Sequence, residues 1–270
     1  MRKKSSRVIS VMLIIVAAGI LIPILVILVW VFTERWAWPD FKPQVFSMRA
    51  LQDILGRSNQ IVPLFLSSIG ISSAAAAISV AISIMTARAF VFYEFKGKRL
   101  LHFLSFLPFM VPATVFAMGI QVSFIKAGLN NTVWGVIIVH VVYSLPYGIR
   151  LLTEGTRGIG QGLEEQARIL GASAMKAFYK VSLPLLIPVI LSAFSMSYIV
   201  SFSQYFLTLL IGGGQVKTFT IVMVPYLQSG DRNVAAVYSV LFLGVTLIVF
   251  GLFDWTAQRL SRNHRINYYE

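Results

Sequence analysis

Long apolar runs are the feature that most constrains how this chain can fold. Stretches of about 20 or more apolar residues follow one another along its 270 residues, and short segments between them hold most of the charges. A run of that length can cross the hydrocarbon core of a bilayer as a helix. Only 12% of the residues are charged, against about 25% in an average soluble domain. The sequence therefore predicts an all-α membrane protein whose surface is covered mainly by lipid.

Six spans are expected, and together they make residues 1–270 a single transmembrane domain. They lie at about 8–32, 61–92, 100–125, 132–152, 185–211 and 234–255. The first is too long for the apolar part of a signal peptide and does not end at small residues, so it is expected to be retained. An even number of spans places both termini on the same side of the membrane.

The basic residues predict which side that is. With both termini inside, the cytoplasmic segments contain more than twice as many lysines and arginines as the outer ones. The positive-inside rule therefore predicts cytoplasmic termini. The same rule accounts for the net charge of +13, so no nucleic-acid partner is expected.

Two connections are longer than simple turns. Residues 34–60 lie outside and contain an amphipathic piece near 48–55, whereas residues 153–184 form the only sizeable cytoplasmic segment. In the latter, residues 161–170 are a helix candidate that Gly171 would end. Ser173 can cap a second short helix. Such an elbow suits docking into a groove of a soluble partner, although periodicity alone favours a plain connection.

The spacing within this loop resembles a family motif. Glu165-Gln166-Ala167, three residues, Gly171, nine residues, Val181, one residue and Leu183-Pro184 is similar to the EAA loop of binding-protein-dependent ABC permeases. The family pattern has Ala at the position of Gln166 and Ile at that of Val181. The loop also falls between the fourth and fifth of six spans, as it does in that family.

The resemblance implies a MetI-like type I importer permease in the bacterial cytoplasmic (inner) membrane. Its elbow would couple to a cytoplasmic dimer of ATPase subunits, through Glu164, Glu165, Ala167, Gly171, Ala172, Leu183 and Pro184. This chain has no Walker A pattern, so ATP and Mg²⁺ would bind the ATPase, and this chain would be non-catalytic, without a cofactor or metal. Two further partners are implied: a second permease, identical or homologous, and an extracytoplasmic substrate-binding protein.

Polar residues within the spans are candidates for the translocation pathway, because they are costly in lipid. We hypothesise that a stripe of polar residues at helical spacing in the fifth span lines this pathway. The stripe consists of Ser197, Ser201, Gln204 and Tyr205, and Gln121 of the third span is expected nearby. The alternative is that the serines pack helices together, which is favoured for each serine taken alone.

Other residues within or at the ends of the spans receive structural interpretations. His140 is expected to be a hydrogen-bonded packing residue rather than a ligand, and Arg88 to snorkel to the interface. Pro108, Pro112 and Pro146 are expected to kink or interrupt their helices.

The substrate is only weakly indicated. Looser similarity at 208–214 and 230–236 to the spermidine/putrescine, iron(III) and thiamine branch favours those solutes or a phosphonate-like one over sugars and sulfate. A secondary transporter or channel is the alternative function, but no inverted repeat or intramembrane ion pair is apparent. A membrane enzyme would need a catalytic cluster within the spans, and none assembles in the sequence.

Overall fold

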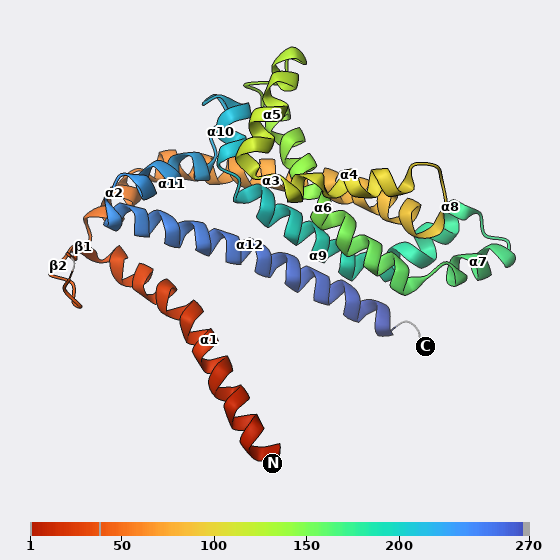
Figure 1. The fold of residues 1–270 in the computed structure, drawn as a ribbon, viewed down its shortest axis with the longest axis horizontal. Helices are drawn as coiled ribbons and strands as arrows, with labels where there is room; N and C mark the ends of the chain where they lie inside the picture. Colours follow the sequence, from red (N-terminus) through yellow and green to blue (C-terminus); the bar gives the residue numbers. More distant parts are fainter. Residues whose placement is uncertain (1, 38, 267–270) are drawn as a thin grey trace. The chain divides into compact units, whose positions relative to one another are not determined.

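The computed structural model describes residues 2–37 and 39–266, and nearly all of them are helical (Figure 1). Five helices are long and apolar enough to cross a membrane, and a bent pair of shorter helices makes a sixth candidate span among the described residues. The chain divides into two compact units. The first contains residues 1–63 and 222–245, and the second contains residues 64–221 and 246–270.

The first unit holds the first span and the segment that follows it. Its elements are α1 (Arg2–Val31), β1 (Thr33–Arg35), β2 (Val45–Phe46), α2 (Arg49–Gly56), the start of α3 (Ser58–Phe92), the end of α11 (Phe219–Gln228) and the start of α12 (Arg232–Ile266). The predicted amphipathic piece is present as α2. The short antiparallel pairing of β1 with β2 was not predicted, because two or three residues carry no alternation pattern.

The second unit contains most of the polytopic bundle. Besides the remainders of α3, α11 and α12, its elements are α4 (Lys98–Met110), α5 (Ala113–Lys126), α6 (Val133–Ile159), α7 (Gly162–Ile169), α8 (Ala174–Ala177), the π-helical turn η1 (Phe178–Ser182), α9 (Leu183–Phe202) and α10 (Phe206–Gly212). Helix α6 packs along α9 and beside α4, whereas α5 lies beside α10 (Figure 1).

Small and apolar side chains form the core of the second unit. Residues of α3, α5, α6 and α10 make one buried cluster that includes Ala75, Ala117, Val139 and Leu207. Two of its buried members, Ala75 and Ala117, are alanines, whose small side chains allow neighbouring helix backbones to approach closely.

The third predicted span, 100–125, is broken rather than continuous. Helices α4 and α5 meet at an angle of 115°. Val111 between them is extended, as expected for a residue before proline, and Pro112 caps α5. Pro112 therefore interrupts the helix as predicted, whereas α6 continues through Pro146 and is not interrupted.

The fifth predicted span, 185–211, has different boundaries. Helical structure runs without a gap from Ala174 through η1 into α9, and it ends at Phe202. A short non-helical turn then leads to α10. The sequence does not signal this break, because it contains neither Gly nor Pro.

Candidate functional site

The elbow after α6 closes on itself through a particular hydrogen-bond pattern. Gly171 has φ +90°, which favours glycine. Its N–H donates to the Arg168 carbonyl at 3.0 Å, and the Ala172 N–H donates to the Ala167 carbonyl at 3.0 Å. Together these two bonds form a Schellman motif at the C-terminus of α7. Ser173 then accepts a hydrogen bond from the Lys176 N–H at 3.3 Å and caps α8, as predicted.

The apex of the elbow is exposed and apolar. Ile169 is 85% exposed and Leu170 is 88% exposed, and Met175 on α8 is exposed as well. Glu165 lies nearby and is also exposed, and together with Arg168 it lines a surface hollow beside α8. Sequence reasoning selected Glu165 and missed Ile169 and Leu170; their apolar character just before a helix-ending glycine was the available signal.

Glu164 has a different environment from Glu165. It is buried, and its two carboxylate oxygens accept hydrogen bonds from the Arg88 guanidinium at 2.5 and 2.9 Å. The Ser182 hydroxyl donates to the same carboxylate. Glu164 was expected at the docking contact; in the chain by itself it is buried in this ion pair, and its place in the docking contact stays a prediction. Arg88 was expected to snorkel to the interface, and the sequence did not indicate that it would pair with Glu164.

Electrostatics keeps Glu164 ionised. The hydrogen bond from Arg88 lowers the pKa of Glu164 below its ordinary value, and the Ser182 hydroxyl and the positive charges of Arg88 and Arg168 act in the same direction. Burial opposes this shift because it penalises the charged form. The bidentate geometry is the strong form of an arginine–carboxylate contact.

Pro184, just before the predicted start of the fifth span, lies inside a continuous helical stretch. Pro184 has no N–H to donate to the preceding turn. The preceding turn is π-helical, and the Leu183 N–H donates to the Phe178 carbonyl five residues back. Leu183 and Pro184 are half-buried in the first turn of α9. The second arm of the elbow is therefore continuous with α9.

A polar cluster around His140 spans the break between α9 and α10. His140 on α6 is buried; its Nδ1 lies 2.8 Å from Ser201 Oγ, and its Nε2 lies 3.0 Å from Thr208 Oγ1. Thr208 donates to the Gln204 carbonyl, so His140 Nε2–H donates to Thr208, and Nδ1 accepts from Ser201. Both ring nitrogens thus make hydrogen bonds to other helices.

The residues proposed for the pathway do not form one helical stripe. Ser197 and Ser201 are buried on α9, whereas Gln204 and Tyr205 are half-buried in the turn after that helix ends. The helical spacing predicted for all four is therefore wrong beyond Ser201. Gln121 on α5 is half-buried, and its amide donates to the Leu210 carbonyl at 3.5 Å.

Ser197 lies where three helices approach closely. A methyl group on Gly148 of α6 would meet the hydroxyl groups of Ser83 on α3 and Ser197 on α9. Within the described chain the Ser197 hydroxyl has no hydrogen-bond partner. The pathway role of the five residues stays a prediction.

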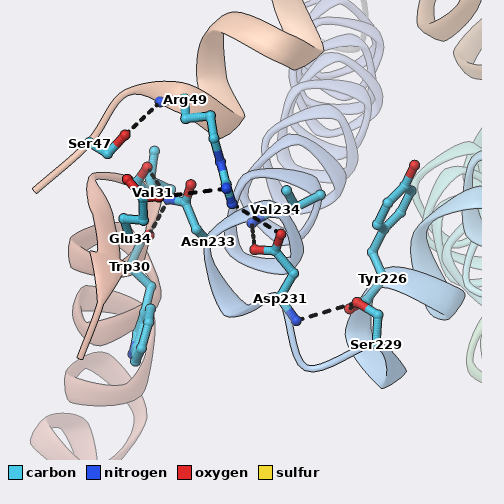
Figure 2. Close-up of polar contacts among 10 residues, drawn as sticks. All are labelled: Trp30, Val31, Glu34, Ser47, Arg49, Tyr226, Ser229, Asp231, Asn233 and Val234. Atoms are coloured by element: carbon cyan, nitrogen blue, oxygen red, sulfur yellow. Dashed lines mark hydrogen bonds and ion pairs between the residues drawn. The ribbon is translucent and has the colours of Figure 1, made fainter. Parts of the chain in front are cut away.

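The first unit contains a second polar cluster (Figure 2). Arg49 on α2 lies between two carboxylates, 3.6 Å from Glu34 and 3.2 Å from Asp231. Asp231 also accepts from the Val234 N–H at 3.2 Å and so caps α12. Asn233 donates to the carbonyls of Trp30 and Val31, at the C-terminal end of α1. Four segments of the first unit are joined in this way.

The fold and the elbow together define a multi-pass helical membrane protein of the permease class. The family described as "Binding-protein-dependent transport system inner membrane component" matches residues 79–262. The chain belongs to this family. The match covers the part of the chain that contains α7, α8 and the Arg88–Glu164 contact.

Individual relatives have unlike substrates in their names. The chain is 26% identical over 202 residues to the ferric transport system permease protein FbpB of Actinobacillus pleuropneumoniae; the match covers 74% of this chain but only 29% of that relative. It is 28% identical over 181 residues to a probable sulfate transport system permease protein of Prototheca wickerhamii, covering 62% and 71%. The relatives thus include the iron branch that the sequence indicated, but a sulfate permease is among them too, so the named substrate varies from one relative to another.

A solved structure has a similar fold. It is titled as a bacterial alginate ABC transporter in complex with an alginate pentasaccharide-bound periplasmic protein, and one of its chains superposes with a TM-score of 0.65. The superposition covers 95% of this chain and 96% of that one at 14% sequence identity. At this identity the likeness shows the fold.

Proposed function

We propose that this chain is a permease subunit of an ATP-binding cassette importer, and that its α7–α8 elbow docks into a groove of a cytoplasmic ATPase subunit. The observation that carries the proposal is the exposed apolar apex formed by Ile169 and Leu170. Large apolar side chains at the tip of a polar loop mark an interaction surface. The family of the chain supplies the class of partner.

The elbow is suited to transmit a mechanical step. Its first arm, α7, is tied by Glu164 to Arg88 on α3, and its second arm is continuous with α9. A displacement at the apex would thus reach two spans. ATP and Mg²⁺ belong to the ATPase dimer in this proposal, and this chain contributes half of the translocation pathway.

The exposed first span supports a second permease as partner. In the most apolar 18-residue window of α1, no residue is buried, so the other elements of its own unit leave this surface uncovered. We propose that another permease subunit, identical or homologous, covers part of this surface and that lipid covers the remainder. A substrate-binding protein would deliver a small polar solute from the outer side, where the Arg49 cluster would lie.

Copurification with the ATPase tests the elbow directly. Leu170→Arg and Glu165→Ala are expected to weaken retention of the ATPase on the tagged permease, because they alter the exposed apex and the hollow beside it. Glu154→Ala is the matched control, since Glu154 is exposed on α6 and, among the described residues, forms an ion pair only with the neighbouring Arg157.

Two outcomes would reject the proposal. Equal retention of the ATPase by the wild-type chain and both apex variants would remove the elbow from the contact. Uptake in proteoliposomes that needs an ion gradient and no ATPase would favour the alternative, a secondary transporter or channel.

A further inference from the structure

The Arg88 side chain lies among three separate segments of the second unit. Its guanidinium makes two parallel bonds to Glu164 of α7, at 2.5 and 2.9 Å. The side chains of this pair are only 20% and 10% exposed, respectively. Arg88 belongs to α3, so the contact joins a membrane span to the elbow across 76 residues of sequence.

Two aromatic rings also contact the Arg88 guanidinium. Its central carbon lies 4.5 Å from the ring centroid of Phe178 in η1 and 5.2 Å from that of Phe92 in α3. Ser182, also in η1, donates to the Glu164 carboxylate. The guanidinium is therefore held by a bidentate bond and by two cation–π contacts, and a lysine ammonium cannot make the bidentate bond.

This arrangement differs from an ion pair that lies within a single helix, α6, of the same unit. Arg157 and Glu154 are both more than half exposed and lie within one helix, three residues apart. Such a pair is strongly solvated and connects nothing beyond its own helix. Only the Arg88 contact, among the ion pairs of the described residues, links α3 to both arms of the elbow.

We infer that Arg88 is a positioning residue that locks the elbow to α3, so that a displacement of the elbow moves α3 and α9 together. This inference rests on the proposed docking of the elbow to an ATPase and deepens it. The two arms converge on the same ion pair: α7 through Glu164, and the η1–α9 rod through Ser182 and Phe178. Without Arg88, a displacement of α7 by the ATPase would not be transmitted to α3.

The first measurement needs only this chain. The sequence contains no cysteine, so Tyr93→Cys and Leu170→Cys provide the only two attachment points for spin labels, and both positions are exposed. In lipid nanodiscs we expect a narrow distance distribution for the otherwise wild-type chain. Arg88→Gln should broaden it, whereas the control Arg157→Gln should leave it unchanged. An unchanged distribution in Arg88→Gln would overturn the inference.

The second measurement uses the complete transporter without labels. Transport per ATP hydrolysed should fall about tenfold in Arg88→Gln, the scale of a lost coupling contact, and should be unaffected in Arg157→Gln. A broadened distribution with wild-type transport per ATP would overturn the positioning role. If Arg88→Gln no longer binds the ATPase, the spin-label distances decide the outcome. A broadened distance distribution in Arg88→Gln then supports the inference, and an unchanged one overturns it.

A conservative variant covers the case in which Arg88→Gln does not fold. Arg88→Lys keeps the charge but cannot make the two parallel bonds, so it should give an intermediate width and an intermediate transport ratio. Wild-type values in Arg88→Lys would overturn the bidentate lock. If no ATPase copurifies with the wild-type chain, the proposed function fails, while the distance distributions still decide whether Arg88 fixes the elbow.

Discussion

Glu164 and Glu165 are neighbours in the sequence, yet their carboxylates face different surroundings. Consecutive positions on a helix point about 100° apart, so when one faces the bundle the other faces away. Glu164 meets Arg88, whereas Glu165 is exposed beside the apex. One helical turn thus carries both an internal anchor and an exposed carboxylate.

Acid should weaken the anchor. Replacing Glu164 by Gln is expected to lower the free energy of unfolding by about 3–5 kcal/mol near neutral pH, because Arg88 would keep an uncompensated charge in a buried site. Arg88 lowers the pKa of Glu164 below its ordinary value of 4.5. The unfolded chain therefore binds this proton more readily than the folded one, and the stabilisation is full above that value and lost as the pH falls through the folded pKa.

Equilibrium unfolding in detergent micelles, followed at several pH values, measures this effect. The difference in unfolding free energy between the wild type and Glu164→Gln should shrink in acid. Glu154→Gln is a suitable control, because Glu154 is exposed and should give a small difference at every pH. A difference for Glu164→Gln that is constant down to strongly acidic pH would contradict the prediction.

Between elements, His140 holds the broken fifth span together. His140→Ala should lower the free energy of unfolding by about 2–4 kcal/mol, since it removes two buried hydrogen bonds and leaves a void beside Ser201 and Thr208. Thermal unfolding in detergent measures the loss. Ser192→Ala is the control, because Ser192 is exposed and donates a hydrogen bond to the Pro188 carbonyl of its own helix. An equal loss in both variants would contradict the assigned role.

The turn after α10 offers a matched pair of glycines. Both have positive φ, +52° at Gly213 and +77° at Gly214. A methyl group on Gly213 would collide with the Asn131 side chain, whereas one on Gly214 would enter open space. Gly214→Ala should therefore cost about 1–2 kcal/mol from backbone strain alone. Gly213→Ala should cost clearly more; equal losses on thermal unfolding would show that Asn131 yields freely.

Some helix boundaries could be predicted from the sequence and others could not. Gly171 and Ser173 marked the elbow correctly, because helix ends are decided by local chemistry. Pro112 likewise marked the break between α4 and α5. The end of α9 at Phe202 carries no such local signal. Long-range contacts could not be predicted either. Nothing near Arg88 in the sequence identifies Glu164 as its partner, because that contact depends on the tertiary packing.

For the whole molecule, the bent pair α4–α5 decides the topology. The described chain has five helices long enough to span a membrane, and the sixth span exists only if α4 and α5 cross together. Phe46 lies between the first and second spans, and Ile169 lies between the fourth and fifth; both are exposed. If the bent pair crosses, three spans separate these two positions, and they lie on opposite faces of the membrane.

Cysteine labelling distinguishes the two topologies. In this cysteine-free chain, a membrane-impermeant maleimide applied to intact spheroplasts should label Phe46→Cys and spare Ile169→Cys. Inverted vesicles should reverse the pattern, because the positive-inside rule predicts that the elbow lies in the cytoplasm. Labelling of both positions from one face would mean that α4–α5 enters and leaves on the same side. The elbow would then lie on the same face of the membrane as the Arg49 cluster. The proposed ATPase at the elbow and the proposed binding protein on the side of the Arg49 cluster would then have to approach from the same face, which would contradict the proposed arrangement.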